Sequence, residues 1–257
     1  MSNIKISINK LVVKSTITIS LFCFISVGKP IPSNTNADTT SVFVKDIDGN
    51  IYTTVKIGNQ TWLVENLRTT KYNDGSPIPK DTSRESWKNA TTPKYCYFNN
   101  MNNADSIKKF GALYNWYVIK TGKLAPTGWH VPDTSDWSIL ENYLIENNYN
   151  WDETTKRNKI SKSLASKTDW KTYKRPGTIG NNLESNNKSG FSALPSGNRN
   201  SLGVFFGIGA NIYWWSSTES VLNIPYAYTR FIEFSHDYLN GADYPESCGF
   251  SVKLIKD

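Results

Sequence analysis

The sequence predicts an α+β domain with short antiparallel strands, two helices and long loops. The 257-residue chain is 38% hydrophobic and 13% aromatic, which is enough to form a packed core. Runs of strand-forming residues lie near residue 50 and near the C-terminus, and the helical patterns fall between them. This order favours terminal strands that pair with each other over a repeating β-α-β sheet.

The N-terminus has the pattern of a secretory signal peptide. Three lysines precede a short apolar run over residues 15–27, and small residues lead up to Gly28, after which we expect cleavage. An uncleaved membrane anchor is the alternative, although the run is short for a membrane span. We therefore expect residues 1–28 to be removed and the protein to be secreted or held at the cell surface.

Without residues 1–28 the charge balance is ordinary. That segment holds three lysines and no acidic residue, so its removal lowers the formal net charge from +7 to +4. The remaining basic residues form no dense cluster, and we expect no nucleic-acid partner. No later apolar run is long enough to predict a membrane span in the mature chain. Residues 29–41 contain two prolines and no aromatic residue, which predicts a flexible linker before one folded domain over 42–257.

The start of the domain predicts a β-meander. Asp48-Gly49 is favoured in a tight hairpin turn and separates a strand over 42–44 from a strand over 51–55. Gly58-Asn59 predicts a second turn before a strand over 61–64.

The first of these turns also resembles the start of a calcium loop, because Asp46, Asp48 and Asn50 alternate. An EF-hand loop needs Gly at its sixth position and Glu at its twelfth, where this chain has Ile51 and Ile57. We therefore interpret the segment as a turn and predict no metal site.

Helical signals lie in the middle of the chain. Asp133 and Asp136 form a capping box before apolar residues at helical spacing, which predicts a helix to about Asn147. A weaker pattern predicts a second helix over 159–167. Residues 110–119 fit a short helix or a buried strand equally well.

Strand patterns return in the last third of the chain, where aromatic and β-branched residues alternate with Gly-rich turns. The predicted strands cover 191–194, 212–216, 226–234 and 250–255.

An ordered series of short motifs runs through the domain. It includes Gln60-Thr-Trp62, Pro126-Thr-Gly-Trp-His-Val-Pro132, Gly190-Phe-Ser-Ala-Leu-Pro195, Tyr213-Trp-Trp-Ser-Ser217 and Gly249-Phe-Ser-Val252. From about Asp46 to Asp257 the chain resembles the Fibrobacter succinogenes major paralogous domain family, whose members are secreted or surface proteins without an established activity. The segment before the capped helix also resembles the wider C-type-lectin-like group. The resemblance thus implies a C-type-lectin-like fold, but it implies function much less firmly because one fold hosts many functions.

The cysteines differ from the pattern that this resemblance implies. Related sequences carry two cysteines where this chain has Ala125 and Leu254, which suggests a disulfide replaced by an apolar contact. The mature chain keeps Cys96 and Cys248, on segments that would be neighbours if the terminal strands pair. A Cys96–Cys248 disulfide and two buried free thiols are both consistent with the sequence.

Groups suited to catalysis are few, and we predict no catalytic residue and no cofactor. His130 precedes the helix cap, where a hydrogen-bonded structural role is favoured over that of a base. Glu65, Glu219, Glu233 and Asp237 would serve a glycosidase only if two of them lay at the right separation, which the sequence does not define.

A binding role has more support. Trp214 and Trp215 are adjacent, so on a strand they point to opposite faces. An outward indole beside Glu219 would stack on a sugar ring; the alternative is that loops cover both rings. Arg199 is predicted either to anchor a loop through a carboxylate or to contact the ligand.

The prediction is therefore a secreted or cell-surface, non-catalytic binding module that recognises a glycan or a surface protein. Trp214, Trp215, Arg199 and Glu219 are its candidate ligand contacts. The alternatives are a structural or adhesion component of the cell surface and a carboxylate-dependent, glycan-active enzyme.

Overall fold

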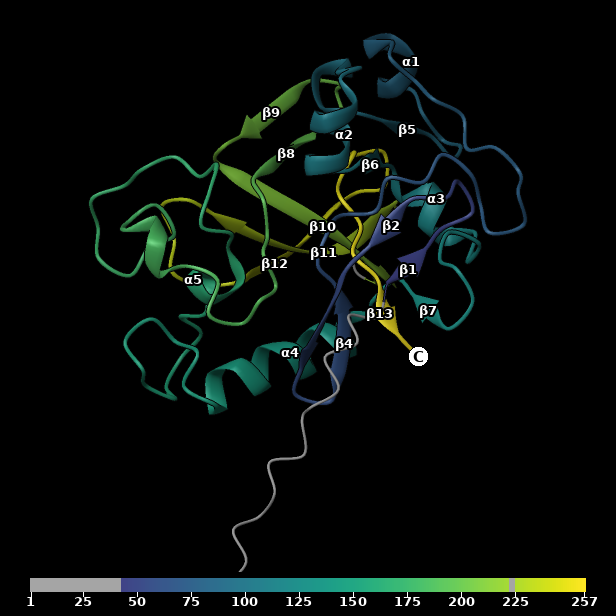
Figure 1. Cartoon of the computed structure of the whole chain (residues 1–257). Helices are drawn as coiled ribbons and strands as arrows, with labels where there is room; N and C mark the ends of the chain where they lie inside the picture. The colour runs from purple at the N-terminus through teal and green to yellow at the C-terminus, as the bar shows by residue number, and fades with distance from the viewer. Residues whose placement is uncertain (1–42, 222–224) are drawn as a thin grey trace, which may run out of the picture. The chain divides into compact units, whose positions relative to one another are not determined.

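The computed structural model describes residues 43–221 and 225–257, which form an α+β domain of mostly antiparallel sheets (Figure 1). The predicted signal peptide over 1–28 and the predicted linker over 29–41 lie outside the described residues.

The largest sheet has five strands in the order β12-β11-β10-β8-β9, and all its pairs are antiparallel except β10 with β8. Its strands are β8 (Ser196–Arg199), β9 (Phe205–Ile208), β10 (Asn211–Glu219), β11 (Tyr226–Glu233) and β12 (Asn240–Pro245). The predicted strands over 212–216 and 226–234 are confirmed as β10 and β11. The described residues contain β8, β9 and β12 as well, which the sequence patterns did not predict.

A second sheet joins the two ends of the domain in the order β3-β4-β13-β7. Its strands are β3 (Thr54–Ile57), β4 (Gln60–Leu63), β7 (Trp129–His130) and β13 (Ile255–Lys256). Ile255 pairs with Trp62 on one side and with His130 on the other. The prediction that the terminal strands pair is therefore confirmed.

Two antiparallel strand pairs complete the β structure: β1 (Val44–Lys45) with β2 (Ile51–Tyr52), and β5 (Tyr95–Cys96) with β6 (Leu113–Tyr114). The Gly58-Asn59 turn is confirmed, since Ile57 pairs with Gln60 and Gly58 has a positive φ of 61°. The β1–β2 turn is longer than the predicted tight turn. It spans residues 46–50 because the Asp46 carboxylate accepts hydrogen bonds from the amides of Asp48 and Asn50.

Helix α4 (Thr134–Glu146) begins at the predicted capping box. The Asp133 side chain accepts from the amides of Ser135 and Asp136, and Asp136 accepts in return from the Asp133 amide. Trp137, Leu140 and Leu144 are the buried residues of this helix.

The other α-helices are short, and two of them were not predicted. The second predicted helix shrinks to α5 (Ser161–Leu164). Residues 110–119 combine both alternatives, since β6 is followed there by α3 (Trp116–Lys120). The sequence patterns did not predict α1 (Arg84–Lys88) or α2 (Ala104–Phe110). No helix among the described residues has the length and apolar character needed to cross a membrane.

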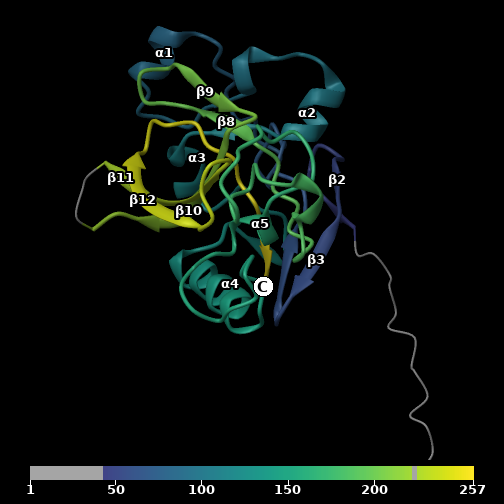
Figure 2. The same ribbon diagram turned by 90° about the vertical axis from the view of Figure 1, so that its left-hand side faces the viewer.

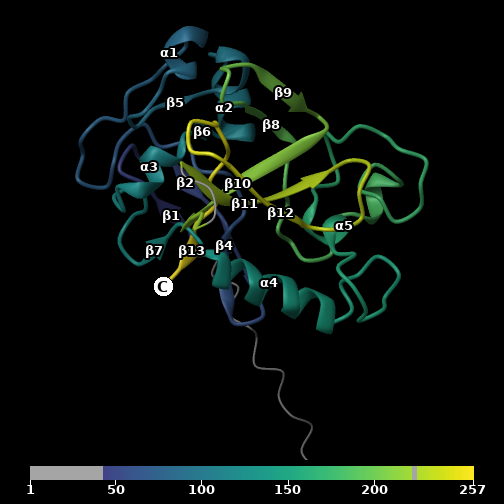
Figure 3. The same cartoon turned by 180° about the vertical axis from the view of Figure 1, so that it is seen from behind.

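The sheet around β10 separates two hydrophobic clusters. Tyr213 and Trp215 belong to one cluster, and Ile212 and Trp214 belong to the other. In Figures 2 and 3, α4 lies below β10 and β11, whereas β9, the edge strand of the same sheet, lies above them beside α1. Because each cluster packs against one face of β10, both faces of this strand are covered.

Candidate functional site

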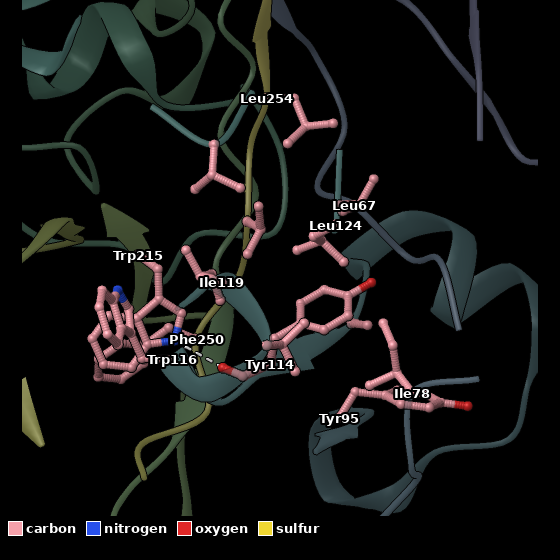
Figure 4. Packing of buried hydrophobic residues seen from close by; sticks show 14 of the residues in the cluster. Leu67, Ile78, Tyr95, Tyr114, Trp116, Ile119, Leu124, Trp215, Phe250 and Leu254 are labelled. Carbon is pink, nitrogen blue, oxygen red and sulfur yellow. Dashed lines mark hydrogen bonds between the residues drawn. The ribbon is translucent and has the colours of Figure 1, made fainter. Parts of the chain in front are cut away.

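Trp214 and Trp215 point to opposite faces of β10, as predicted, but neither reaches solvent: both are 0% exposed. The Nε1–H group of Trp214 donates to Asn66 Oδ1 at 3.1 Å, and that of Trp215 donates to the Tyr114 carbonyl at 2.8 Å (Figure 4). The interpretation with an outward, sugar-stacking indole is therefore wrong for this conformation. Both rings are buried because a hydrophobic cluster packs against each face of β10.

Arg199 is also buried and anchors loops instead of contacting solvent. Its guanidinium donates to three backbone carbonyls, those of Asp81 (2.8 Å), Ser83 (3.0 Å) and Gly203 (3.2 Å). It also lies 4.3 Å from the ring centroid of Trp87. The predicted anchoring role is confirmed, with carbonyl oxygens in place of the expected carboxylate.

Glu219 is the one member of the predicted set that reaches solvent. Lys120 Nζ lies 2.7 Å from Glu219 Oε1 and 3.9 Å from Oε1 of the buried Glu246. The hydrogen bond from Lys120 lowers the pKa of Glu219, whereas burial raises the pKa of Glu246. The four predicted contacts thus do not line one open pocket.

Cys96 and Cys248 are free, buried thiols, so the disulfide hypothesis is wrong for this structure and the alternative of two free thiols holds. Their segments are neighbours. Strand β6 pairs with Cys96 on one side and with the segment after Cys248 on the other, and that segment also pairs with Arg199 on β8 through Gly249. Burial raises the pKa of each thiol to about 12. The side chains pack into different hydrophobic clusters.

The four carboxylates considered for catalysis bind separate partners. Glu65 accepts from Thr53. Glu233 faces His236 at 2.9 Å. Asp237 accepts from the indole of Trp151. Among the described residues, no three His, Cys, Asp or Glu side chains gather in a way that would hold a metal ion.

Exposed aromatic rings gather instead around the turn that follows β11. Trp151, Tyr173 and Tyr238 are 41%, 43% and 37% exposed, and we call them the aromatic loop face. Tyr173 packs edge-on against Phe234 at 5.5 Å, and Tyr238 lies 5.1 Å from the His236 ring. All three rings therefore surround residues 234–238.

The Trp151 ring packs against a glycine and is hydrogen-bonded to a carboxylate. A Cβ atom on Gly177 would lie 2.2 Å from the indole, so the ring lies directly against that glycine. Trp151 Nε1 donates to Asp237 Oδ2 at 3.3 Å, and Arg175 lies 3.7 Å from the other oxygen of this carboxylate. A hollow of about 440 Å³ lies beside the ring of Tyr173, lined by residues 172–175. This surface combines a preorganised ring with nearby charged and polar groups.

Lys162 holds the segment that carries much of this surface. Its ammonium donates to the carbonyls of Thr178, Asn181 and Asn182 and to the side-chain oxygen of Asn186. Burial lowers the pKa of Lys162 to about 8. Asn186 is thus structural, since its side chain also donates to the carbonyls of Ser166 and Ile179.

A second concave region, which we call the sheet pocket, has a volume of about 600 Å³ and lies between the start of α4 and the β10–β12 strands. Its lining includes Thr134, Trp137, Tyr228, Arg230, Gly241 and Asp243.

Sequence reasoning missed both regions for identifiable reasons. Trp151 lies in a polar loop, outside any strand or helix pattern, and such a position does not reveal exposure, since Trp170 in another polar loop is only 4% exposed. The sheet pocket has no local signal, because its residues come from α4, β11 and β12 and meet only through tertiary pairing.

Comparison with known proteins gives one family. The family model described as the Fibrobacter succinogenes major domain matches residues 55–256. No curated protein and no solved structure matches the chain.

Proposed function

The chain belongs to the Fibrobacter succinogenes major domain family, and we propose that this member is a secreted or cell-surface, non-catalytic module that binds glycan chains on its aromatic loop face. We also propose that its domain is C-type-lectin-like, which the pairing of the two domain ends through β4 and β13 supports.

The observation that carries the proposal is the exposed, fixed indole of Trp151. The ring packs against Gly177, while the residue as a whole is 41% exposed. A sugar ring presents apolar C–H groups to such a surface, and its hydroxyls bond to polar groups at the rim. Tyr173 and Tyr238 extend the aromatic area, and Arg175 and Asp237 supply a donor and an acceptor.

The ring is also held in place before any ligand binds. Contacts with Gly177 and Asp237 fix the orientation of Trp151, so little side-chain freedom is lost on binding. A preorganised ring on a loop fits a binding role and requires no reactive group.

Replacement of Trp151 by alanine tests the proposal. We expect the W151A variant to lose affinity for glycans about tenfold or more, because stacking worth about 1.4 kcal/mol corresponds to that factor. The measurement is binding of the protein to an array of neutral and acidic polysaccharides, followed by calorimetry on the best ligand.

The matched control is Phe206→Ala. Phe206 is 49% exposed on the edge strand β9, so this change also removes an exposed aromatic ring. The proposal fails if no glycan binds, or if W151A binds as tightly as the unaltered protein.

One observation favours the adhesion alternative. Leu202, Phe206 and Ile208 are exposed at or beside the edge strand β9, and an apolar sheet edge is suited to contact with another surface protein. Capture of surface proteins that Phe206→Ala abolishes, together with an array free of glycan binding, would favour this alternative.

A further inference from the structure

The sheet pocket is built on one face of the large sheet and is covered by α4. Tyr228 and Arg230 alternate along β11, so their side chains share a face. Asp243 and Gly241 on β12 lie opposite Tyr228 and Arg230, respectively. Trp137 and Thr134, from the first turn of α4, complete the wall.

Trp137 forms part of the pocket wall from within the core. The residue is 0% exposed, and its buried Nε1–H group has no hydrogen-bond partner within the described part of the chain. Its indole therefore reports on the pocket, whereas the hydrogen bonds to an occupant come from other residues.

Arg230 supplies the donors of the pocket. Its Nη1 lies so close to Gly241 that a Cβ atom there would stand 2.1 Å away, so glycine makes room for the guanidinium. The nearest carboxylate is that of Glu141, at 3.8 Å from Nη2, which is too long for a hydrogen bond. The guanidinium is thus available to an occupant.

Acceptors lie in the same pocket. Asp243 Oδ2 accepts from Ser220, whereas its Oδ1 accepts no hydrogen bond from residues 43–221 and 225–257. The pocket therefore offers an anionic acceptor together with a cationic donor.

The charges decide the class of occupant. An anion would be attracted by Arg230 but repelled by Asp243. A cation would be attracted by Asp243 but repelled by Arg230. The capping box already uses the amides at the start of α4, because Asp133 accepts from Ser135 and Asp136 and Thr134 donates to Thr218. The helix terminus therefore adds no free anion site.

A neutral sugar fits these groups because each hydroxyl both donates and accepts. A volume of about 600 Å³ lies within the range of small-molecule sites. We propose that the sheet pocket binds one neutral sugar unit, with Arg230 as donor and Asp243 as acceptor.

This site is separate from the aromatic loop face. Thr134 begins α4, whereas Trp151 follows its end, and a 13-residue helix spans about 20 Å. The pocket takes a free monosaccharide or a chain end, so it goes beyond the proposed function and does not depend on it.

The test follows the indole N–H signal of Trp137 by ¹H–¹⁵N NMR in the folded protein, with the signal assigned from Trp137→Phe. The probes are glucose, galactose, mannose and xylose, with glucuronate and glucosamine as charged counterparts. We expect a saturable shift with at least one neutral sugar and weaker effects with the charged probes. Asp243→Asn should weaken binding about tenfold, and Trp151→Ala should leave it unchanged.

Gly241→Ala is a second variant, because the added Cβ displaces Arg230 and should weaken binding in the same way. The indole signals of the other tryptophans report whether each variant remains folded. The proposal is overturned if no neutral sugar shifts the Trp137 signal, if glucuronate or glucosamine binds more tightly, or if both folded variants bind as the unaltered protein does. Loss of polysaccharide binding in Trp151→Ala with an unchanged pocket titration would separate the two sites.

Discussion

Buried cationic side chains hold this domain together through backbone carbonyls. Lys253 is 0% exposed and donates to the carbonyls of Leu63, Val64 and Phe191. Lys162 and Arg199 make the same kind of contact elsewhere. Burial lowers the pKa of Lys253 to about 7, against the opposing charge of Glu65. Each cation satisfies several carbonyls in loops that have few ladder bonds, which explains why these residues are inside.

His130 links the C-terminus to the helix cap and gives a pH-dependent stability. Its Nδ1 lies 2.6 Å from Asp257 Oδ1, and its Nε2 lies 3.1 Å from Asp136 Oδ2. Burial opposes the charged ring, but the hydrogen bonds to both carboxylates outweigh it and raise the pKa of His130 above 6.5. Folding therefore favours the protonated form.

The resulting stability is fully present below pH 6.5 and is lost as the pH rises through the folded-state pKa. We expect the free energy of unfolding, measured with urea between pH 5 and about 8.5, to fall over that window, and His130→Gln to lack this component. An equal pH dependence in the variant would contradict the assignment. Asp105→Asn on α2, distant from this contact in the sequence, is the control for general charge effects.

For single residues, the sequence predicted the role and direction of a side chain better than it predicted whether the side chain is exposed. The structural role of His130 and the opposite directions of Trp214 and Trp215 followed from local rules. Their burial did not, because it depends on two clusters built from distant segments.

Among the helices and strands, those marked by a signal in their own sequence were predictable. Helix α4 has a capping box and an apolar stripe, and the β3–β4 hairpin has a Gly-Asn turn. Strand β8, by contrast, reads Ser-Gly-Asn-Arg and is buried throughout, and β12 contains Asn, Gly, Asp and Pro. Such strands exist because neighbours on the sheet pair with them, which no local pattern records.

The loop over residues 171–187 is an irregular element, and we predict that Lys162 holds it in place. Lys162 contacts three of its carbonyls and Asn186, so we expect Lys162→Met to loosen this loop. Limited proteolysis should cleave within 171–187 at least several-fold faster, and glycan affinity on the aromatic loop face should fall with it. Lys188→Met is the matched control, since this exposed lysine donates to Asn148 outside the loop. Unchanged cleavage in Lys162→Met would show that the loop is held by other contacts.

On the scale of the whole domain, the last strand joins the two ends. Strand β13 lies between β4 and β7, and Leu63 donates through its amide to the Leu254 carbonyl at 2.9 Å. Leu254 is fully buried, and Ala125 packs against the same cluster. These are the two positions where the family resemblance implied a cysteine pair, and here both residues contact one apolar cluster.

If that contact closes the domain, Leu254→Ala should destabilise all of it at once. We expect a loss of about 2–5 kcal/mol in the free energy of unfolding, the usual range for a buried leucine. Far-ultraviolet circular dichroism and tryptophan fluorescence should report one coincident transition at lower denaturant concentration, because β13 connects segments from both ends of the domain. Lys256→Ala, at an exposed position of the same strand, should change stability by no more than about 0.5 kcal/mol. Two separate transitions in Leu254→Ala would mean that the terminal sheet unfolds independently, and the apolar contact would then be a local feature and not the closure of the domain.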